Sequence, residues 1–162
     1  MKRVVVIGCP GSGKSTFARE LNRITGLPLY HLDMMYWNSD KTTVDKAVFR
    51  ARLAEVLGRE TWIVDGNYAS TMEMRIEACD TVIFLDYPTD LCLAGIRERQ
   101  GKPRADMPWI EDGDDEEFLA FVKAYQKESR PTVLRLLAQC GHKQIHIFGA
   151  RSEADAFLRS LQ

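Results

Sequence analysis

The sequence has no excess of charge of either sign. Its 162 residues include 22 lysines and arginines against 23 aspartates and glutamates, which gives a net charge of −1. A protein whose main task is to grip nucleic acid usually carries a basic excess or a basic stripe, because contacts to phosphate supply much of the affinity. No such run is present, so direct nucleic-acid binding is disfavoured.

Long apolar runs are also missing. No stretch approaches the ~20 residues that span a bilayer. The first apolar run, Val4–Ile7, is too short for a signal peptide and leads straight into a glycine-rich segment. We therefore expect no membrane partner and a cytoplasmic location.

Cysteine pairs and histidine clusters are absent as well. The cysteines occur singly, without a CxxC pair, at Cys9, Cys79, Cys92 and Cys140. Reduced thiols are the simplest interpretation of this pattern. No metal-ligand spacing relates the three histidines, His31, His142 and His146. We interpret these as partly buried or surface side chains.

Short apolar runs alternate with segments of helical spacing, in a length that fits one domain over residues 1–162. The runs are Arg3–Ile7, a weaker Leu27–Leu32, Trp62–Val64, Thr81–Leu85 and Gln144–Phe148. The helical segments are Ser15–Thr25, Val44–Leu57, Asp90–Arg99, Asp115–Leu137 and Ser152–Leu161. Apolar strands that alternate with helices predict an α/β fold with a parallel sheet covered on both faces.

Three local features refine this prediction. Pro131 cannot continue an interior helical ladder and should break the helix around it. The helix at 44–57 should turn five side chains inward, namely Val48, Phe49, Leu53, Val56 and Leu57. Gly101–Asp115 has two prolines, two glycines and no apolar periodicity. Such an insert, at about 100–115, is expected to be a surface excursion that acts as a lid.

The strongest motif follows the first apolar run. Residues 8–15, GCPGSGKS, fit the pattern G-x-x-x-x-G-K-[ST] between a strand and a helix. Its glycines let the backbone N–H groups curl around phosphate oxygens, and the following helix contributes its positive end. The predicted nucleotide-binding residues are Gly8, Pro10, Gly11, Ser12, Gly13, Lys14, Ser15 and Thr16. Lys14 would neutralise phosphate charge, and the Ser15 hydroxyl would ligate Mg²⁺.

A second acidic group usually holds the metal or its water in such proteins. Two candidates end apolar runs: Asp65, in WIVDGNY, and Asp86, in VIFLDYP. A strand-end aspartate also commonly caps a turn. Asp65 is the preferred metal ligand because Gly66, which follows it, permits close approach of the backbone to phosphate.

Taken together, these segments resemble the adenylate-kinase-like P-loop kinases, and most closely the small topology modulation protein (FlaR-type) family. The resemblance is carried by GCPGSGKST, His31-Leu-Asp33 with Trp37, WIVDGNY, TVIFLDYP, RERQGKPRADM and DDEEFLAFV. It implies the P-loop NTPase three-layer sandwich, a five-stranded parallel sheet of order 2-3-1-4-5 with helices on both faces and a lid. The nucleotide would lie at the carboxyl ends of the strands.

The resemblance also implies roles for individual arginines. Arg99 and Arg104 would be catalytic lid arginines, with Arg97 and Arg130 as helpers, and Arg151 would stack on the base. In such families an arginine commonly stands seven residues after the proline of the FLDYP segment, where this chain has Gly95. The capping of the last helix is assigned to Ser152 on its chemistry alone.

The predicted function is that of a small-molecule kinase that binds ATP and Mg²⁺ and passes the γ-phosphoryl group to a nucleotide-, nucleoside- or metabolite-type acceptor. A GTPase would need an N-K-x-D motif, which is absent. The alternative is a non-kinase ATP-binding regulator linked to DNA topology. The sequence predicts neither the acceptor nor the oligomeric state.

Two routes to the acceptor stay open. Related small-molecule kinases hold an acceptor hydroxyl with an aspartate after the second strand, and Asp33 stands there as the candidate catalytic residue. Nucleoside monophosphate kinases instead use arginines from the following helix, where Arg50 and Arg52 stand. Tyr36 or Trp37 would stack on a ring or belong to the core.

Overall fold

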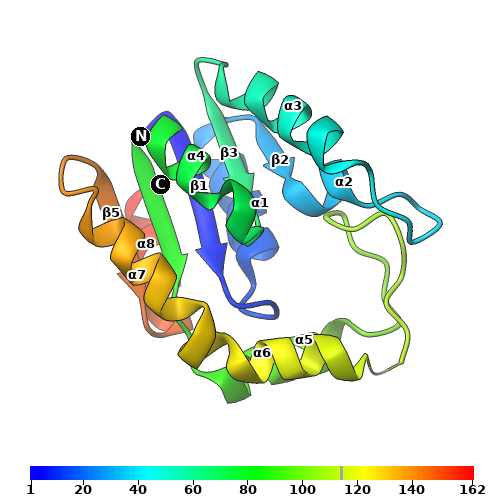
Figure 1. Cartoon of the computed structure of the whole chain (residues 1–162). Coiled ribbons are helices and arrows are strands. Elements are labelled where there is room, and N and C mark those ends of the chain that lie inside the picture. The colour runs from blue at the N-terminus through cyan, green and yellow to red at the C-terminus, as the bar shows by residue number, and fades with distance from the viewer. Residues whose placement is uncertain (114) are drawn as a thin grey trace.

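The structure is a computed structural model that describes residues 1–113 and 115–162. Its centre is a parallel five-stranded sheet of order β2-β3-β1-β4-β5 (Figure 1). The strands are β1 (Arg3–Gly8), β2 (Leu29–His31), β3 (Trp62–Asp65), β4 (Thr81–Leu85) and β5 (Gln144–Phe148). The predicted sheet and its order are confirmed. Apolar runs form its centre because both faces of a parallel sheet are covered, and Val4–Ile7 in β1 are fully buried.

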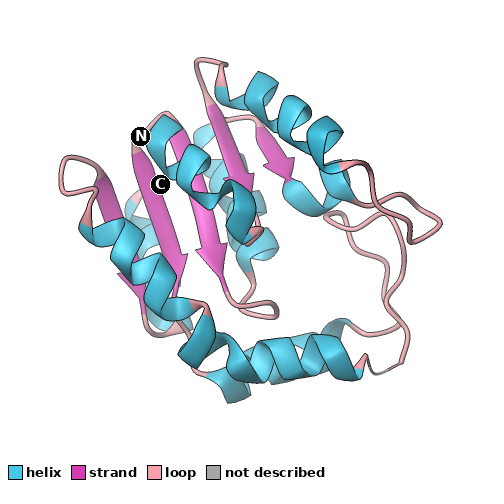
Figure 2. Cartoon of the chain, in the orientation of Figure 1, coloured by secondary structure: helices cyan, strands magenta, loops and turns pink. Residues whose placement is uncertain are grey.

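Helices cover both faces of the sheet (Figure 2). On one face α1 (Lys14–Thr25) and α8 (Arg151–Ser160) enclose a core with Val4 and Val6. On the other face a second core, with Val5 and Ile7, is closed by helices α3 (Lys46–Leu57), α4 (Ala69–Ala78) and α7 (Arg130–Ala138). The alternation along β1 thus sends neighbouring side chains into two different cores.

The helices α5 (Thr89–Arg99) and α6 (Glu116–Glu128) lie beyond the carboxyl ends of β1 and β4 (Figure 1). The segment after α5 runs from there toward α2 (Leu32–Tyr36) and α3 (Figure 1). Within its described residues, 100–113, it has turns and bends but no helix or strand. Residue 114, part of the predicted insert, lies outside the described residues. The insert therefore crosses the carboxyl edge of the sheet, where the predicted nucleotide loop also lies.

Several sequence predictions need correction. The short α2 and the whole of α4 were not predicted. The buried apolar positions of α4 are Met72 and Ile76, one turn apart, in a stretch with too few apolar residues to show a periodic stripe. Val48 was expected inside but is 43% exposed. The helix break is confirmed near Pro131, which takes a place in the first turn of α7 where its missing N–H costs nothing.

The predicted cap of the last helix is wrong. Helix α8 begins at Arg151, so Ser152 already lies inside it. The Glu153 carboxylate instead accepts hydrogen bonds from the backbone N–H groups of Gly149, at 2.7 Å, and Ala150, at 3.3 Å. A carboxylate three residues into a helix satisfies these donors as well as a serine at the cap would.

All four cysteines are buried and unpaired, which leaves them as free thiols. Among the described residues no helix is long and apolar enough to cross a membrane.

Candidate phosphate-transfer site

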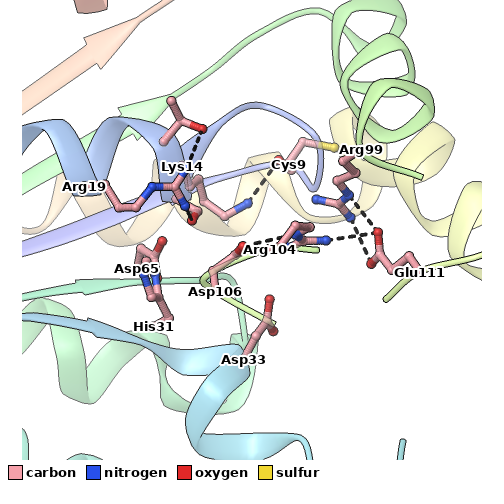
Figure 3. Close-up of polar contacts among 12 residues, drawn as sticks. Cys9, Lys14, Arg19, His31, Asp33, Asp65, Arg99, Arg104, Asp106 and Glu111 are labelled. Carbon is pink, nitrogen blue, oxygen red and sulfur yellow. Dashed lines mark hydrogen bonds and ion pairs between the residues drawn. The ribbon is translucent and has the colours of Figure 1, made fainter. Parts of the chain in front are cut away.

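The loop between β1 and α1 adopts a conformation that glycine alone accommodates easily. Gly11 and Gly13 have φ angles of 83° and 91°, in the left-handed region. Gly13 precedes the first residue of α1, so the N–H groups of that first turn face the loop. The Lys14 ammonium bends back over the loop and donates to the carbonyl of Cys9 at 3.1 Å (Figure 3). A loop of this kind offers backbone donors and one cation to an anion.

The surroundings of Lys14 disfavour its protonated, positively charged form. Burial lowers the pKa of Lys14, and the nearby Asp65 and Asp33 carboxylates only partly offset this effect. The ammonium has one neutral hydrogen-bond partner, the Cys9 carbonyl. A bound phosphate would bring negative charge into direct contact with the ammonium.

Helix α5 packs directly on the loop. A Cβ atom on Gly95 would lie 2.1 Å from the Gly11 carbonyl oxygen, and a Cβ on Gly11 would lie 2.0 Å from the Cys92 carbonyl oxygen. No side chain fits at position 95 without moving the loop. The structure thus explains why this chain has glycine at a position where the families that it resembles commonly have arginine.

We expect Gly95→Ala to destabilise the protein and weaken nucleotide binding. At an exposed helix position this change would stabilise the protein by about 1 kcal/mol, because alanine has a higher helix propensity than glycine. At position 95 the added methyl group should instead lower the free energy of unfolding by about 1–3 kcal/mol, because it overpacks against Gly11. Thermal unfolding checks this, with Ala94→Ser, at the exposed neighbouring position, as the control. A Gly95→Ala protein as stable as the parent would contradict the contact.

Asp65 ends β3 beneath the loop and is only 5% exposed. One of its carboxylate oxygens lies 2.8 Å from Nδ1 of His31, the last residue of β2. Burial opposes protonation of His31, but the hydrogen bond and charge of Asp65 outweigh it and raise the pKa of His31. The pairing register puts both residues opposite each other on neighbouring strands. His31 thus holds the Asp65 carboxylate in place.

The turn after Asp65 is held by a buried arginine. Arg75, in α4, is fully buried and donates to the backbone carbonyls of Gly66, Asn67 and Tyr68. Burial lowers the pKa of Arg75 to about 10. The Asn67 side-chain oxygen in turn accepts from the backbone N–H of Gly8 at 3.4 Å. These contacts fix the turn against the phosphate loop.

Asp33 lies at the start of α2, just past the end of β2. The Tyr68 hydroxyl donates to one of its carboxylate oxygens, Oδ1. Burial raises the pKa of Asp33, while the Tyr68 hydrogen bond and the charge of Lys14 oppose that rise. The Tyr68 bond orients the carboxyl group and leaves Oδ2 for another partner.

Arg19, one turn into α1, reaches the two hydroxyls that follow Lys14. It donates to Ser15 Oγ at 2.9 Å and to Thr16 Oγ1 at 3.3 Å. These hydroxyls include the predicted Mg²⁺ ligand, so Arg19 would have to release Ser15 when a metal binds there.

Arg99, at the end of α5, and Arg104, in the insert, form a network with carboxylates of the insert (Figure 3). Arg99 donates to both oxygens of Glu111, at 2.9 and 3.3 Å. Arg104 makes a two-pronged pair with Asp106, at 3.0 and 2.6 Å, and lies 3.0 Å from Glu111. Burial, and then the charge of Arg104, lower the pKa of Arg99. The two guanidinium groups thus converge on the Glu111 carboxylate.

Asp86 and Arg130 were considered separately from sequence, but the structure joins them. Arg130 Nε and Nη2 both donate to the Asp86 carboxylate, at 2.8 Å each. This pair ties the end of β4 to the start of α7.

The metal assignment gives a prediction. If Ser15 and Asp65 hold Mg²⁺ and its waters, Asp65→Asn should raise the Mg²⁺ concentration needed for half-maximal ADP release about tenfold or more. Asp86→Asn is the matched control. It should lower thermal stability by weakening the Arg130 pair and leave the Mg²⁺ requirement unchanged. The reverse pattern would transfer the metal role to Asp86.

Three other sequence candidates, Arg97, Arg50 and Arg52, are not among the residues that line the cavity described below. Arg97 is exposed on α5. Arg50 and Arg52 are also exposed, and donate to the backbone carbonyls of Ser70 and Met35 respectively. Arg151, at the start of α8, does line the cavity near the loop.

Trp37 contacts the insert through an aromatic pair. Its ring lies edge-on to that of Trp109, with centroids 5.7 Å apart, and Lys41 lies over the Trp109 ring. Tyr36 instead packs in an aromatic cluster with Phe49 and Tyr68.

One cavity of about 1270 Å³ gathers these groups at the carboxyl edge of the sheet. It is lined by loop residues including Lys14 and Ser15, by the carboxylates Asp33 and Asp65, and by the arginines Arg99 and Arg104. It extends between α4 and the pair α6 and α7, where Met72, Thr132 and Leu136 line it. Most of the predicted site residues therefore face one space.

Local sequence patterns did not reveal several residues that shape this site, among them Arg19, His31, Arg75 and Glu111. Arg19 follows Ser15 by four residues, a helical spacing that could have signalled the contact. The others depend on pairings across β2 and β3, within the α4 turn and across the lid, which no local pattern shows.

No protein-family model and no curated protein matches this chain. Solved structures do. Shikimate kinase from Bacteroides thetaiotaomicron has a TM-score of 0.61 at 22% identity, over 99% of this chain and 96% of that chain. Shikimate kinase from Acinetobacter baumannii, in complex with shikimate, has a TM-score of 0.66 at 18% identity, over 99% of this chain and 90% of that chain. These likenesses establish the α/β fold of the P-loop kinases for this chain.

Proposed function

We propose that the protein is an ATP-dependent small-molecule kinase that transfers the γ-phosphoryl group to a hydroxyl of an acceptor. One observation carries the proposal: the phosphate loop with Lys14 and the carboxyl group of Asp33 line the same cavity. Its volume of about 1270 Å³ exceeds the ~300–1,000 Å³ of an ordinary single-ligand pocket. There is room for a nucleotide and an acceptor together.

The residues around the loop fit a nucleoside triphosphate. The loop N–H groups and Lys14 would hold the phosphates. A second hollow beside the loop is lined by Gly13, Thr16, Tyr87 and Arg151, where the base would lie against the Arg151 side chain.

The residues also fit Mg²⁺. Ser15 and Asp65 supply a hydroxyl and a carboxylate, the oxygen ligands that Mg²⁺ takes alongside water and substrate phosphates. Among the described residues no group of three or more histidine, cysteine or acidic side chains could hold a metal by itself. When bound, Mg²⁺ would neutralise charge on the phosphates.

Asp33 would act on the acceptor. As the acceptor oxygen bonds to the γ-phosphorus, the bond from that phosphorus to the β–γ bridging oxygen breaks, and ADP leaves with that oxygen. The hydroxyl proton passes to Asp33, whose raised pKa suits it to accept one. Tyr68 would position the carboxyl group.

Arg99 and Arg104 would stabilise the phosphoryl group in transit. Charge spreads over the oxygens of the transferring group, so guanidinium groups aimed at them lower the barrier. Both arginines line the cavity. Glu111 must yield at least one of them to the phosphate, since it now binds Arg99 at both oxygens.

The test is acceptor-dependent ADP release with MgATP against nucleosides, nucleotides and small hydroxylated metabolites. ATP binding without ADP release for any acceptor would favour the alternative, an ATP-binding regulator linked to DNA topology. The resemblance to topology modulation proteins stays a prediction.

The lid gives a further prediction. The ring contact between Trp109 and Trp37 holds residues 100–113 in place. Trp109→Ala should therefore open the segment and speed its proteolysis several-fold, since an aromatic pair contributes ~0.5–1.5 kcal/mol to such a contact. A nucleotide that spans both subsites should slow cleavage of the parent. Limited proteolysis followed by mass spectrometry measures both, and Ile110→Ala, at an exposed lid position, is the control. Equal cleavage with and without nucleotide would contradict closure.

A further inference from the structure

We infer that the acceptor is a hydroxyl-bearing molecule without net negative charge, whose apolar body lies between α4 and the pair α6 and α7. The inference rests on the proposed kinase function and narrows the class of its substrate. It follows from which charges line the part of the cavity beyond the phosphate loop.

The cations that face this part of the cavity come from the end of α5, the insert and the loop between α2 and α3, and they are already paired. Arg99 binds Glu111, and Arg104 binds Asp106 and Glu111. Lys41 lies 3.5 Å from Asp112 and over the Trp109 ring. On the proposed function, Arg99 and Arg104 serve the transferring phosphoryl group once Glu111 releases them, and Lys41 remains with Asp112 and Trp109.

Arginines that could have bound an acceptor anion are held elsewhere. Arg130 is engaged by Asp86 through two donors. Arg50 and Arg52 donate to backbone carbonyls. None of these three is among the described residues that line the cavity.

The remaining cations of the cavity lie on the nucleotide side or on the lid surface. Lys14 and Arg19 lie in the first two turns of α1, next to the loop, and Arg151 is the first residue of α8. Lys102 is exposed on the lid segment.

The wall formed by α4, α6 and α7 is apolar and carries no positive charge. Its lining residues are Ala69, Met72, Phe118, Leu119, Phe121, Tyr125, Glu128, Thr132, Val133 and Leu136. Among these described residues Glu128 is the only charged one. Phe121 is 45% exposed, a large apolar side chain left open to a ligand.

A phosphate or carboxylate lodged against this wall would lose its hydration and meet a negative charge, with no cation to replace the lost water. An apolar body would gain from burial there. At the other end of the acceptor, a hydroxyl would meet Asp33. The site should therefore favour an acceptor without net negative charge by about 100-fold or more over its anionic counterpart, as sites do when a charge would be left unpaired.

The experiment uses a protein-free small-molecule extract of cells, divided on an anion-exchange resin into a flow-through and a retained fraction. Each is incubated with the full chain and ATP labelled in its γ-phosphate, and label transferred to new products is measured. Lys14→Ala serves as the control for contaminating activity. We expect transfer in the flow-through fraction. Transfer confined to the retained fraction would overturn the inference but keep the kinase function. No transfer in either would overturn the proposed function, and the inference with it.

A pair of variants then tests where the body lies. Thr132→Trp places a large ring on the α7 face that lines the cavity, whereas Ala138→Trp places it on an exposed position of the same helix outside the lining. With the flow-through fraction, Thr132→Trp should raise the KM for the acceptor about tenfold and leave the KM for ATP unchanged. Ala138→Trp should change neither. Equal effects of the two variants would overturn the assignment of this wall.

Discussion

Replacing Asp33 with asparagine should reduce acceptor-dependent ADP release by about 100-fold or more, the usual scale for a lost acid–base group. ATP binding should be intact, because the phosphates are held by the loop and Lys14. The change removes the proton acceptor but keeps the shape of the side chain, and Tyr68 can still donate to the amide oxygen. Steady-state kinetics together with nucleotide-induced thermal shifts separates the two effects.

Two further measurements sharpen this result. Asp40→Asn, an exposed aspartate in the same region whose carboxylate binds Thr42, is the matched control and should keep full turnover. The parent should lose activity as the pH falls through the pKa of Asp33, which burial raises, so this acid limb lies above the pH where an exposed aspartate titrates. Normal turnover by Asp33→Asn would make Asp33 structural and favour an acceptor site at Arg50 or Arg52.

Replacing Lys14 with alanine should abolish most of the nucleotide-induced thermal shift and lower turnover about 100-fold or more, since a cation on transferring phosphate oxygens is lost. The fold should survive. The pKa of Lys14 is lowered by burial, so at neutral pH the ammonium is less favoured in the folded protein than in the unfolded chain. Removing it should not lower the free energy of unfolding of the nucleotide-free protein.

The control for this change is Lys123→Ala, an exposed lysine of α6. Thermal shifts measured across an ATP titration give both the stability of the free protein and the affinity. An unchanged shift in Lys14→Ala would refute the assignment of the loop as the phosphate site, whatever the acceptor.

The fold was largely accessible from sequence. Apolar runs such as Val4–Ile7 and Thr81–Leu85 predicted buried parallel strands, and the ends of all five runs lie within two residues of the observed strand ends. The strand order came from the resemblance, because periodicity does not report which strands are neighbours. Helix α4 was not predicted, because its inward face is short and because its buried Arg75 has the character of a surface residue in the sequence.

The site was accessible only in part. The spacing of the glycines, Lys14 and Ser15 predicts a phosphate loop locally, since the groups that would hold phosphate stand on consecutive residues. The partners of Asp65 and Asp33 lie 34 and 35 residues away, in His31 and Tyr68. Such pairs form only when β2 and β3 lie side by side.

The sequence alone therefore determined the strand–loop–helix that would cradle phosphate, because its chemistry is contained in consecutive residues. Tertiary structure decided the use of the charged side chains. Asp86 and Arg130 neutralise each other, Glu111 draws Arg99 and Arg104 together, and Gly11 leaves room for nothing larger than Gly95 on α5. The physical reason is that a charge or a small residue takes its role from what lies opposite it, and packing brings those partners from distant parts of the chain.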